Sequence, residues 1–104
     1  YVKGSNATLA FTKFPITCVL ELDGVDNRKT RRFYMDIGKL LHKNKIPFTL
    51  HWGKINDYMQ KNPLDKFYAK SKIDSWKDAR EKVFDDKKAK RVFNNQFLRK
   101  VKLS

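Results

Sequence analysis

Residues 46–56, with the sequence IPFTLHWGKIN, form the stretch around which the rest of the chain is arranged. Pro47 ends the helical pattern before it, because proline lacks the backbone N–H that a helix interior needs. Apolar side chains then occupy every second position, at Phe48, Leu50 and Trp52. This period predicts a short strand with one apolar face. We expect the strand to end in a turn at Gly53 that holds Lys54 on a sheet rim, where functional sites are often built.

A second alternating stretch runs from residue 16 to residue 22 and predicts a strand with one face in the core. The residues on that face are Ile16, Cys18, Leu20 and Leu22. We expect Cys18 to be a small buried side chain and not a nucleophile, because no neighbouring residue in the sequence would activate its thiol. A further short strand is expected at residues 8–12, which contain Leu9 and Phe11.

Helical periodicity separates and follows these strands. Asp26-Asn27 is expected to cap a helix over residues 28–43, with His42 on its solvent side. The apolar stripe of that helix is Phe33, Ile37, Leu40 and Leu41. Its first turn is basic, which is unfavourable with the helix dipole. This helix should therefore pack through its stripe and leave a charged outer face.

The second half of the chain is predicted to be helical. Residues 56–60 form a turn of helix, Asn62-Pro63 breaks it, and a small apolar face follows at Leu64, Phe67 and Tyr68. A long helix is expected over residues 71–86, with one side formed by Ile73, Trp76, Ala79, Arg80 and Val83. A polar break at residues 85–88 precedes a last helix that begins near Asn94 or Asn95.

Together these elements predict a single α+β domain over residues 1–104. Strand, helix and strand make a crossover unit, which should be right-handed if both strands join one sheet. We expect a small mixed or antiparallel sheet with helices packed on one face, the other face being left for another structure.

Composition limits the classes of partner. The chain has 24 Lys and Arg against 11 Asp and Glu, a formal net charge of +13. Such a balance favours nucleic acid, an acidic surface or an acidic partner domain. The single cysteine excludes an internal disulfide and indicates a reducing, cytoplasmic location. His42 and His51 do not have the spacing of metal ligands, so no metal site is expected. No apolar run has the length of a signal peptide or membrane span, and the start at Tyr1 suggests a piece of a longer protein.

The segment ending in His51-Trp52-Gly53-Lys54 resembles a signature near the C-terminus of FAD-linked oxidases of the vanillyl-alcohol-oxidase type. The nearest members in pattern are aldonolactone and alditol oxidases and flavin-linked sterol (cholesterol) oxidases. The resemblance extends over nearly the whole chain, through the order of its elements. Its companions are the strand at 16–22, the helix at 28–43, the helix with Trp76 and Arg80, Phe84-Asp85, and Phe93-Asn94-Asn95-Gln96-Phe97-Leu98.

The resemblance implies that this chain is the C-terminal part of the cap, or substrate-binding, domain of a flavoenzyme. Such an enzyme oxidises a CH–OH group by hydride transfer to FAD, which is bound mainly by an N-terminal FAD-binding domain. Lys54 would be the catalytic cation beside the flavin and the substrate, His51 and Trp52 would shape the substrate pocket, and Gly53 would let the backbone approach the cofactor. The alcohol could be a sugar lactone, an alditol or a sterol, and the isolated chain should be inactive.

Two other classes of function remain open. A basic nucleic-acid-binding module would use the net charge and the segment 87–104, which has seven basic residues and no acidic one. Against it, Phe33, Trp76 and Phe97 lie on apolar stripes and not among the basic residues, where base-stacking side chains would be expected. The third class is a non-catalytic domain whose basic face docks an acidic partner.

Overall fold

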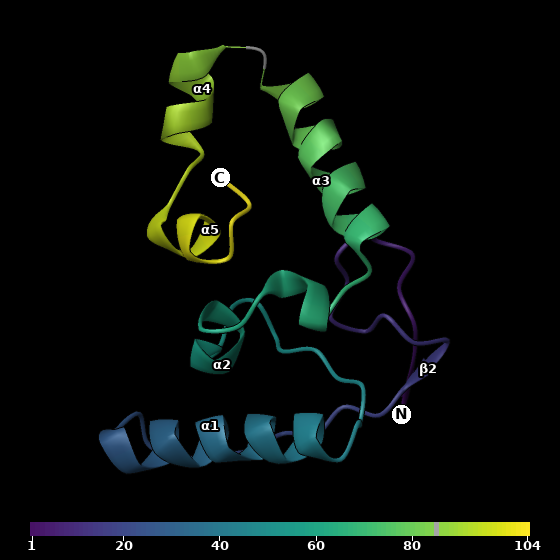
Figure 1. Cartoon of the computed structure of the whole chain (residues 1–104), viewed down its shortest axis with the longest axis vertical. Helices are drawn as coiled ribbons and strands as arrows, with labels where there is room; N and C mark the ends of the chain where they lie inside the picture. The colour runs from purple at the N-terminus through teal and green to yellow at the C-terminus, as the bar shows by residue number, and fades with distance from the viewer. Residues whose placement is uncertain (85) are drawn as a thin grey trace.

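The computed structural model of the chain describes residues 1–84 and 86–104 and has the expected α+β class. The described residues form a two-stranded antiparallel sheet, five α-helices and one 3-10 helix (Figure 1). The elements are β1 (Val2–Lys3), β2 (Ile16–Thr17), α1 (Arg28–Lys43), α2 (Asp57–Gln60), η1 (Leu64–Lys66), α3 (Lys70–Val83), α4 (Lys87–Val92) and α5 (Gln96–Lys100).

The sheet is much smaller than predicted. β1 pairs with β2 in the register Val2–Thr17 and Lys3–Ile16, and beyond Thr17 no described segment offers a partner strand. The prediction of a strand through Leu22 with Cys18 in the core is therefore wrong. Ile16 and Leu20 are 73% and 70% exposed, Cys18 is exposed, and Thr17 on the opposite side is buried. An alternating pattern forms a strand only where a neighbour satisfies its backbone groups.

The predicted strand at 46–52 is irregular backbone, and residues 8–12 form bends and turns. The expected crossover unit is consequently absent from the described part of the chain. The predicted apolar face is nevertheless confirmed, because Phe48, Leu50 and Trp52 all pack against the core. Burial on alternate sides thus occurs here without a sheet ladder.

Helix α1 has the predicted limits. Its cap is Asn27, whose side-chain oxygen accepts the Thr30 N–H at 3.0 Å. The basic first turn is compensated by two carboxylates outside it: Arg31 pairs with Asp26 at 2.6 Å and with Asp57 at 2.8 Å. These contacts also tie the start of α1 to the start of α2.

The face that α1 buries differs from the predicted stripe. Its buried residue is Gly38, which lies against the ring of Tyr58, whereas Phe33 and Leu40 are 50% and 54% exposed. His42 was predicted to be a surface residue, but it faces inward: Nδ1 lies 2.7 Å from the Tyr58 hydroxyl and the ring packs on Phe48. The small Gly38 lets α2 approach closely, and this approach sets the helix rotation.

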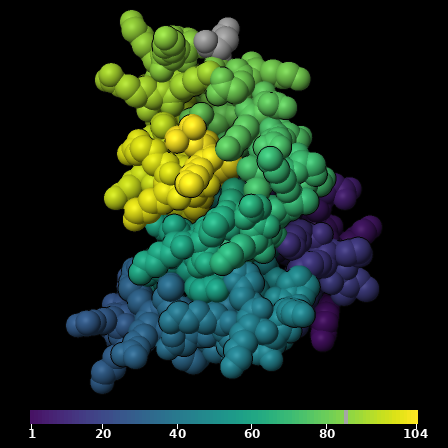
Figure 2. Space-filling view, in the orientation of Figure 1, coloured from purple at the N-terminus to yellow at the C-terminus, as the bar shows by residue number. Residues whose placement is uncertain are grey.

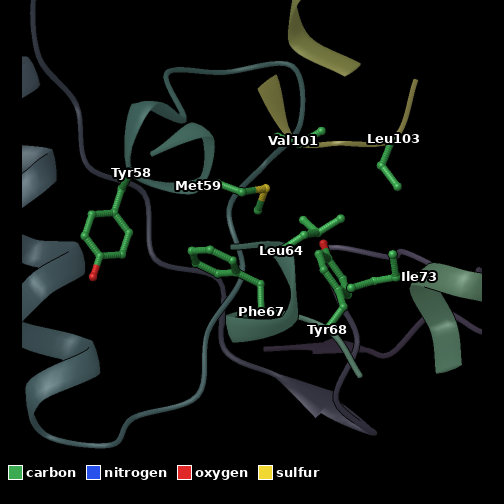
Figure 3. Packing of buried hydrophobic residues seen from close by; sticks show 8 residues of the cluster. All are labelled: Tyr58, Met59, Leu64, Phe67, Tyr68, Ile73, Val101 and Leu103. Atoms are coloured by element: carbon green, nitrogen blue, oxygen red, sulfur yellow. The ribbon is translucent and has the colours of Figure 1, made fainter. Parts of the chain in front are cut away.

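The core is centred on the α2–η1 segment (Figure 3). Met59 and Phe67 are fully enclosed, and the C-terminal segment contributes Val101 and Leu103. The buried cluster consists of Tyr58, Met59, Leu64, Phe67, Tyr68, Ile73, Val101 and Leu103. The predicted apolar face at Leu64, Phe67 and Tyr68 is thus confirmed.

The C-terminal helices follow the prediction in part. Helix α3 buries Ile73 and Arg80 as expected, but it ends at Val83, which is 70% exposed. The predicted end at residue 86 came too late, and Asp85, which belongs to the predicted polar break, lies outside the described residues. Helix α4 was not predicted, whereas α5 begins after the expected cap Asn95, whose side chain accepts the Leu98 N–H at 2.8 Å.

The chain is extended for its size, with α1 at one end and α4 at the other (Figures 1 and 2). Its radius of gyration is 15.0 Å, against about 13 Å for a compact domain of this length. Its accessible surface is 8190 Å², against about 6,100 Å² for a compact monomer of this mass. In the described part, no helix combines the length and apolar character that crossing a bilayer requires.

Candidate functional site

The predicted site residues form one tight turn at positions 51–54. The Gly53 N–H donates to His51 Nδ1 at 3.0 Å, and the Lys54 N–H donates to the His51 carbonyl at 3.3 Å. The structure therefore brings His51, Trp52, Gly53 and Lys54 together as a local unit. The turn takes the place of the predicted strand end.

Trp52 anchors this turn to the rest of the molecule. Its indole N–H donates to the Leu9 carbonyl at 3.0 Å, and its ring stacks on Tyr68 and meets Phe97 edge-on. The Trp52 carbonyl in turn accepts the Asn56 side-chain amide at 2.9 Å. One side chain thus joins the N-terminal loop, the core and α5, so the turn is held from several directions.

His51 and Lys54 lie on the outer side of the turn. His51 is exposed and its ring is tilted against Phe11, with centroids 4.8 Å apart. Lys54 is exposed, and within residues 1–84 and 86–104 no carboxylate lies in ion-pair range of its ammonium group. A Cβ on Gly53 would meet nothing nearer than His51 Cε1 at 3.4 Å, so the backbone there is open. The arrangement presents a cation beside accessible backbone.

Two grooves in the described structure lie away from this turn. The larger, about 650 Å³, lies between α1 and α2 and has charged walls that include Arg28, Arg32, Lys39 and Lys61. In its wall, Arg31 donates hydrogen bonds to the carboxylates of Asp26 and Asp57, and these bonds, Asp26 first, raise the pKa of Arg31. This guanidinium is therefore committed to internal pairing. The second, about 340 Å³, is formed by α3, Phe93 and Leu98 and contains Arg80. Neither groove includes residues 51–54.

Sequence reasoning missed the surroundings of Arg31 and Arg80. Arg31 belongs to a basic run that predicts a solvated face, and its pairing with Asp57 joins residues 26 positions apart. Arg80 lies on the apolar side of α3, and this position predicts that its side chain is buried. Nothing in the sequence indicates a groove next to it. Both environments depend on contacts between separate elements.

Comparisons of the chain with protein-family models, with curated protein sequences and with solved structures found no match.

Proposed function

We propose that this chain is the cap, or substrate-binding, part of an FAD-dependent oxidoreductase that oxidises a CH–OH group of a sugar lactone, an alditol or a sterol. The supporting observation is the turn at 51–54, in which a firmly anchored Trp52 carries an exposed Lys54 with no ion-pair partner among the described residues. A preorganised cation stabilises charge that develops during a reaction, because it needs no rearrangement at that moment.

Each residue of the turn has a distinct part in the proposed site. FAD, when bound, would supply a hydride acceptor for the carbinol carbon of the substrate. Lys54 would stabilise the negative charge that this transfer creates, or hold a substrate hydroxyl. His51 would form the adjoining wall, Trp52 would fix the geometry, and Gly53 would leave room for close approach to the backbone.

The residues fit one wall of a flavin site, not a complete site. Lys54 and Gly53 are accessible, but neither of the two grooves described above adjoins them. The chain should accordingly bind neither FAD nor substrate tightly on its own, and it requires an FAD-binding domain.

Uncovered surface supports a partner domain. The accessible area of 8190 Å² exceeds that of a compact monomer by about 2,000 Å², which is more than the roughly 800 Å² that one partner buries in a standard interface. Part of the excess is the outer face of α1, where Phe33 and Leu40 are half exposed. In the proposal this surface is covered by the FAD-binding domain of the same protein.

The test uses the full-length gene product that contains this chain. We expect it to carry a visible flavin absorbance that a lactone, an alditol or a sterol bleaches in the absence of oxygen. Lys54→Met should slow the bleaching about 100-fold or more, the usual effect of removing a preorganised electrostatic group. Lys72→Met removes the same charge from an exposed position of α3 and should leave the rate unchanged.

Two results would contradict the proposal. A purified protein without flavin would exclude the enzyme class. A flavoprotein whose reduction rate is equally insensitive to both substitutions would leave Lys54 without a part in the reaction.

A further inference from the structure

A shallow apolar groove of about 340 Å³ lies between α3 and the segment that contains Phe93 and Leu98. We call it the Arg80 groove; the lining residues used below are Trp76, Arg80, Val83, Phe84 and Phe93. Phe84 and Phe93 stack across the end of the groove, with ring centroids 4.9 Å apart. An ion pair between Glu81 and Lys90 also joins α3 to α4. The two walls are thus connected by side chains.

Arg80 is the charged side chain of this lining, and among the described residues it has no carboxylate partner. The residue is 9% exposed, its Nη2 atom is enclosed without a hydrogen-bond partner, and the guanidinium lies 5.7 Å from the centre of the Phe84 ring. A buried guanidinium is costly unless it is paired and hydrogen-bonded. A carboxylate that enters from the groove would give the guanidinium the anionic hydrogen-bond acceptor that the described residues do not provide.

Apolar surface continues beyond the groove. Val83 and Phe93 on its rim are 70% and 61% exposed, and Val92 next to it is 77% exposed. Contiguous apolar surface of this kind marks contact sites for other macromolecules. The surface is too open to enclose a small molecule, but it suits side chains projecting from a second polypeptide.

The surrounding charge selects an acidic partner. Residues 87–104 carry seven basic side chains and no acidic one, and among the described residues only Lys90 of this segment forms an ion pair. Complementary charge accelerates association and discriminates against basic partners. The apolar groove next to this basic segment distinguishes the surface from a site that binds only phosphate groups.

We propose that the Arg80 groove docks an acidic, amphipathic segment of another polypeptide. Apolar side chains of the segment cover Trp76, Val83 and Phe93, and one of its carboxylates pairs with Arg80. This proposal is independent of the flavin site, because it concerns a different surface and requires no cofactor.

The test is titration of the 104-residue chain with a synthetic peptide of about 14 residues, or about four helical turns. The peptide has Leu at positions i, i+3, i+4 and i+7, Glu at most others, and no Trp. A change in the protein's Trp fluorescence, to which Trp52 also contributes, then reports occupancy beside Trp76. We expect saturable binding. Arg80→Met and Val83→Asp should each weaken it about tenfold or more, as for central interface positions.

Arg99→Met is the matched control, because all three substitutions lower the net charge by one and Arg99 is exposed on α5 outside the groove lining. It should change the affinity by less than about threefold, the effect of a rim charge. Val83 is already exposed, so Val83→Asp tests the groove even if Arg80→Met does not fold.

Several outcomes would overturn the proposal. These are no binding of the acidic peptide, equal binding of the same peptide with Lys in place of Glu, or equal effects of Val83→Asp and Arg99→Met. If a single-stranded oligonucleotide or vesicles of anionic phospholipid displace the peptide and lose affinity in Val83→Asp, the groove serves that class of partner instead.

Discussion

Gly38→Ala should destabilise the protein, although the same change stabilises most helices. Alanine in a helix interior is ordinarily favoured over glycine by about 1 kcal/mol. Here the added Cβ would lie 2.5 Å from Cγ of Tyr58. Because real Cβ atoms do not approach a ring carbon this closely, either the Tyr58 ring or the whole of α1 must move.

The cost follows from what holds Tyr58. Its ring is 7% exposed and packs edge-on against Phe67, and its hydroxyl lies 2.7 Å from His42 Nδ1. Overpacking of a filled core costs about 1–3 kcal/mol, and loss of the hydrogen bond costs about 1 kcal/mol more. After subtraction of the helix preference, we expect Gly38→Ala to lower the free energy of unfolding by about 2 kcal/mol.

Urea unfolding measures this change through the transition midpoint at constant slope. Gly53→Ala is the control, because its Cβ meets only His51 at 3.4 Å, and it should stay within about 0.5 kcal/mol of wild type. In a Tyr58→Ala background the penalty of Gly38→Ala should disappear. If Gly38→Ala proves as stable as the wild type, the close packing of α1 on α2 described above is incorrect.

Three further predictions address single positions. Lys45 has φ 56° just after α1, so Lys45→Gly should raise the free energy of unfolding by about 0.5–1 kcal/mol in the same urea assay; a loss of stability would contradict this. Hydrogen bonds from Arg31 lower the pKa of Asp26 below 3.8. The pairing therefore stabilises the fold fully above the ordinary pKa of the carboxyl group, and this stabilisation is lost as the pH falls through the lowered pKa. In acid unfolding experiments, Asp26→Asn should lose less stability than the wild type over that pH range. Cys18 is exposed, so a thiol reagent should label it fully in the native protein, and protection until unfolding would refute its placement.

Local patterns predicted those parts of the fold that depend on neighbouring residues in the sequence. Asn27 and Asn95 cap their helices as predicted, and α1 has its predicted limits. Failures occurred where the outcome depends on distant segments. The alternation at residues 16–22 indicated a strand, but a strand also needs a partner, and the described chain provides one only for Ile16 and Thr17.

The rotation of α1 has a similar explanation. Its sequence offers two apolar faces, one with Phe33 and Leu40 and another through Met35, and the close fit of Gly38 to Tyr58 selects the second. The inward placement of His42 follows from that choice. Steric fit between helices leaves no periodic signal, so the hydrophobic pattern alone favoured the wrong face.

The candidate site was located by sequence, but its surroundings were not. The adjacency of His51, Trp52, Gly53 and Lys54 follows from their being consecutive, and the hydrogen bond between Gly53 and His51 gives them a defined turn. The anchoring of Trp52 by Leu9 spans 43 residues and had no local signal. The assignment of Lys54 to a flavin site stays a prediction.

The burial of Val101 and Leu103 has a consequence for synthesis. These side chains are 3% and 2% exposed, and they close a core whose centre lies between residues 58 and 68. During translation that centre leaves the ribosome well before the two residues that cover it. The nascent domain must therefore expose Met59 and Phe67 for an interval in which chaperones can bind them, and folding is completed only after Leu103 has emerged.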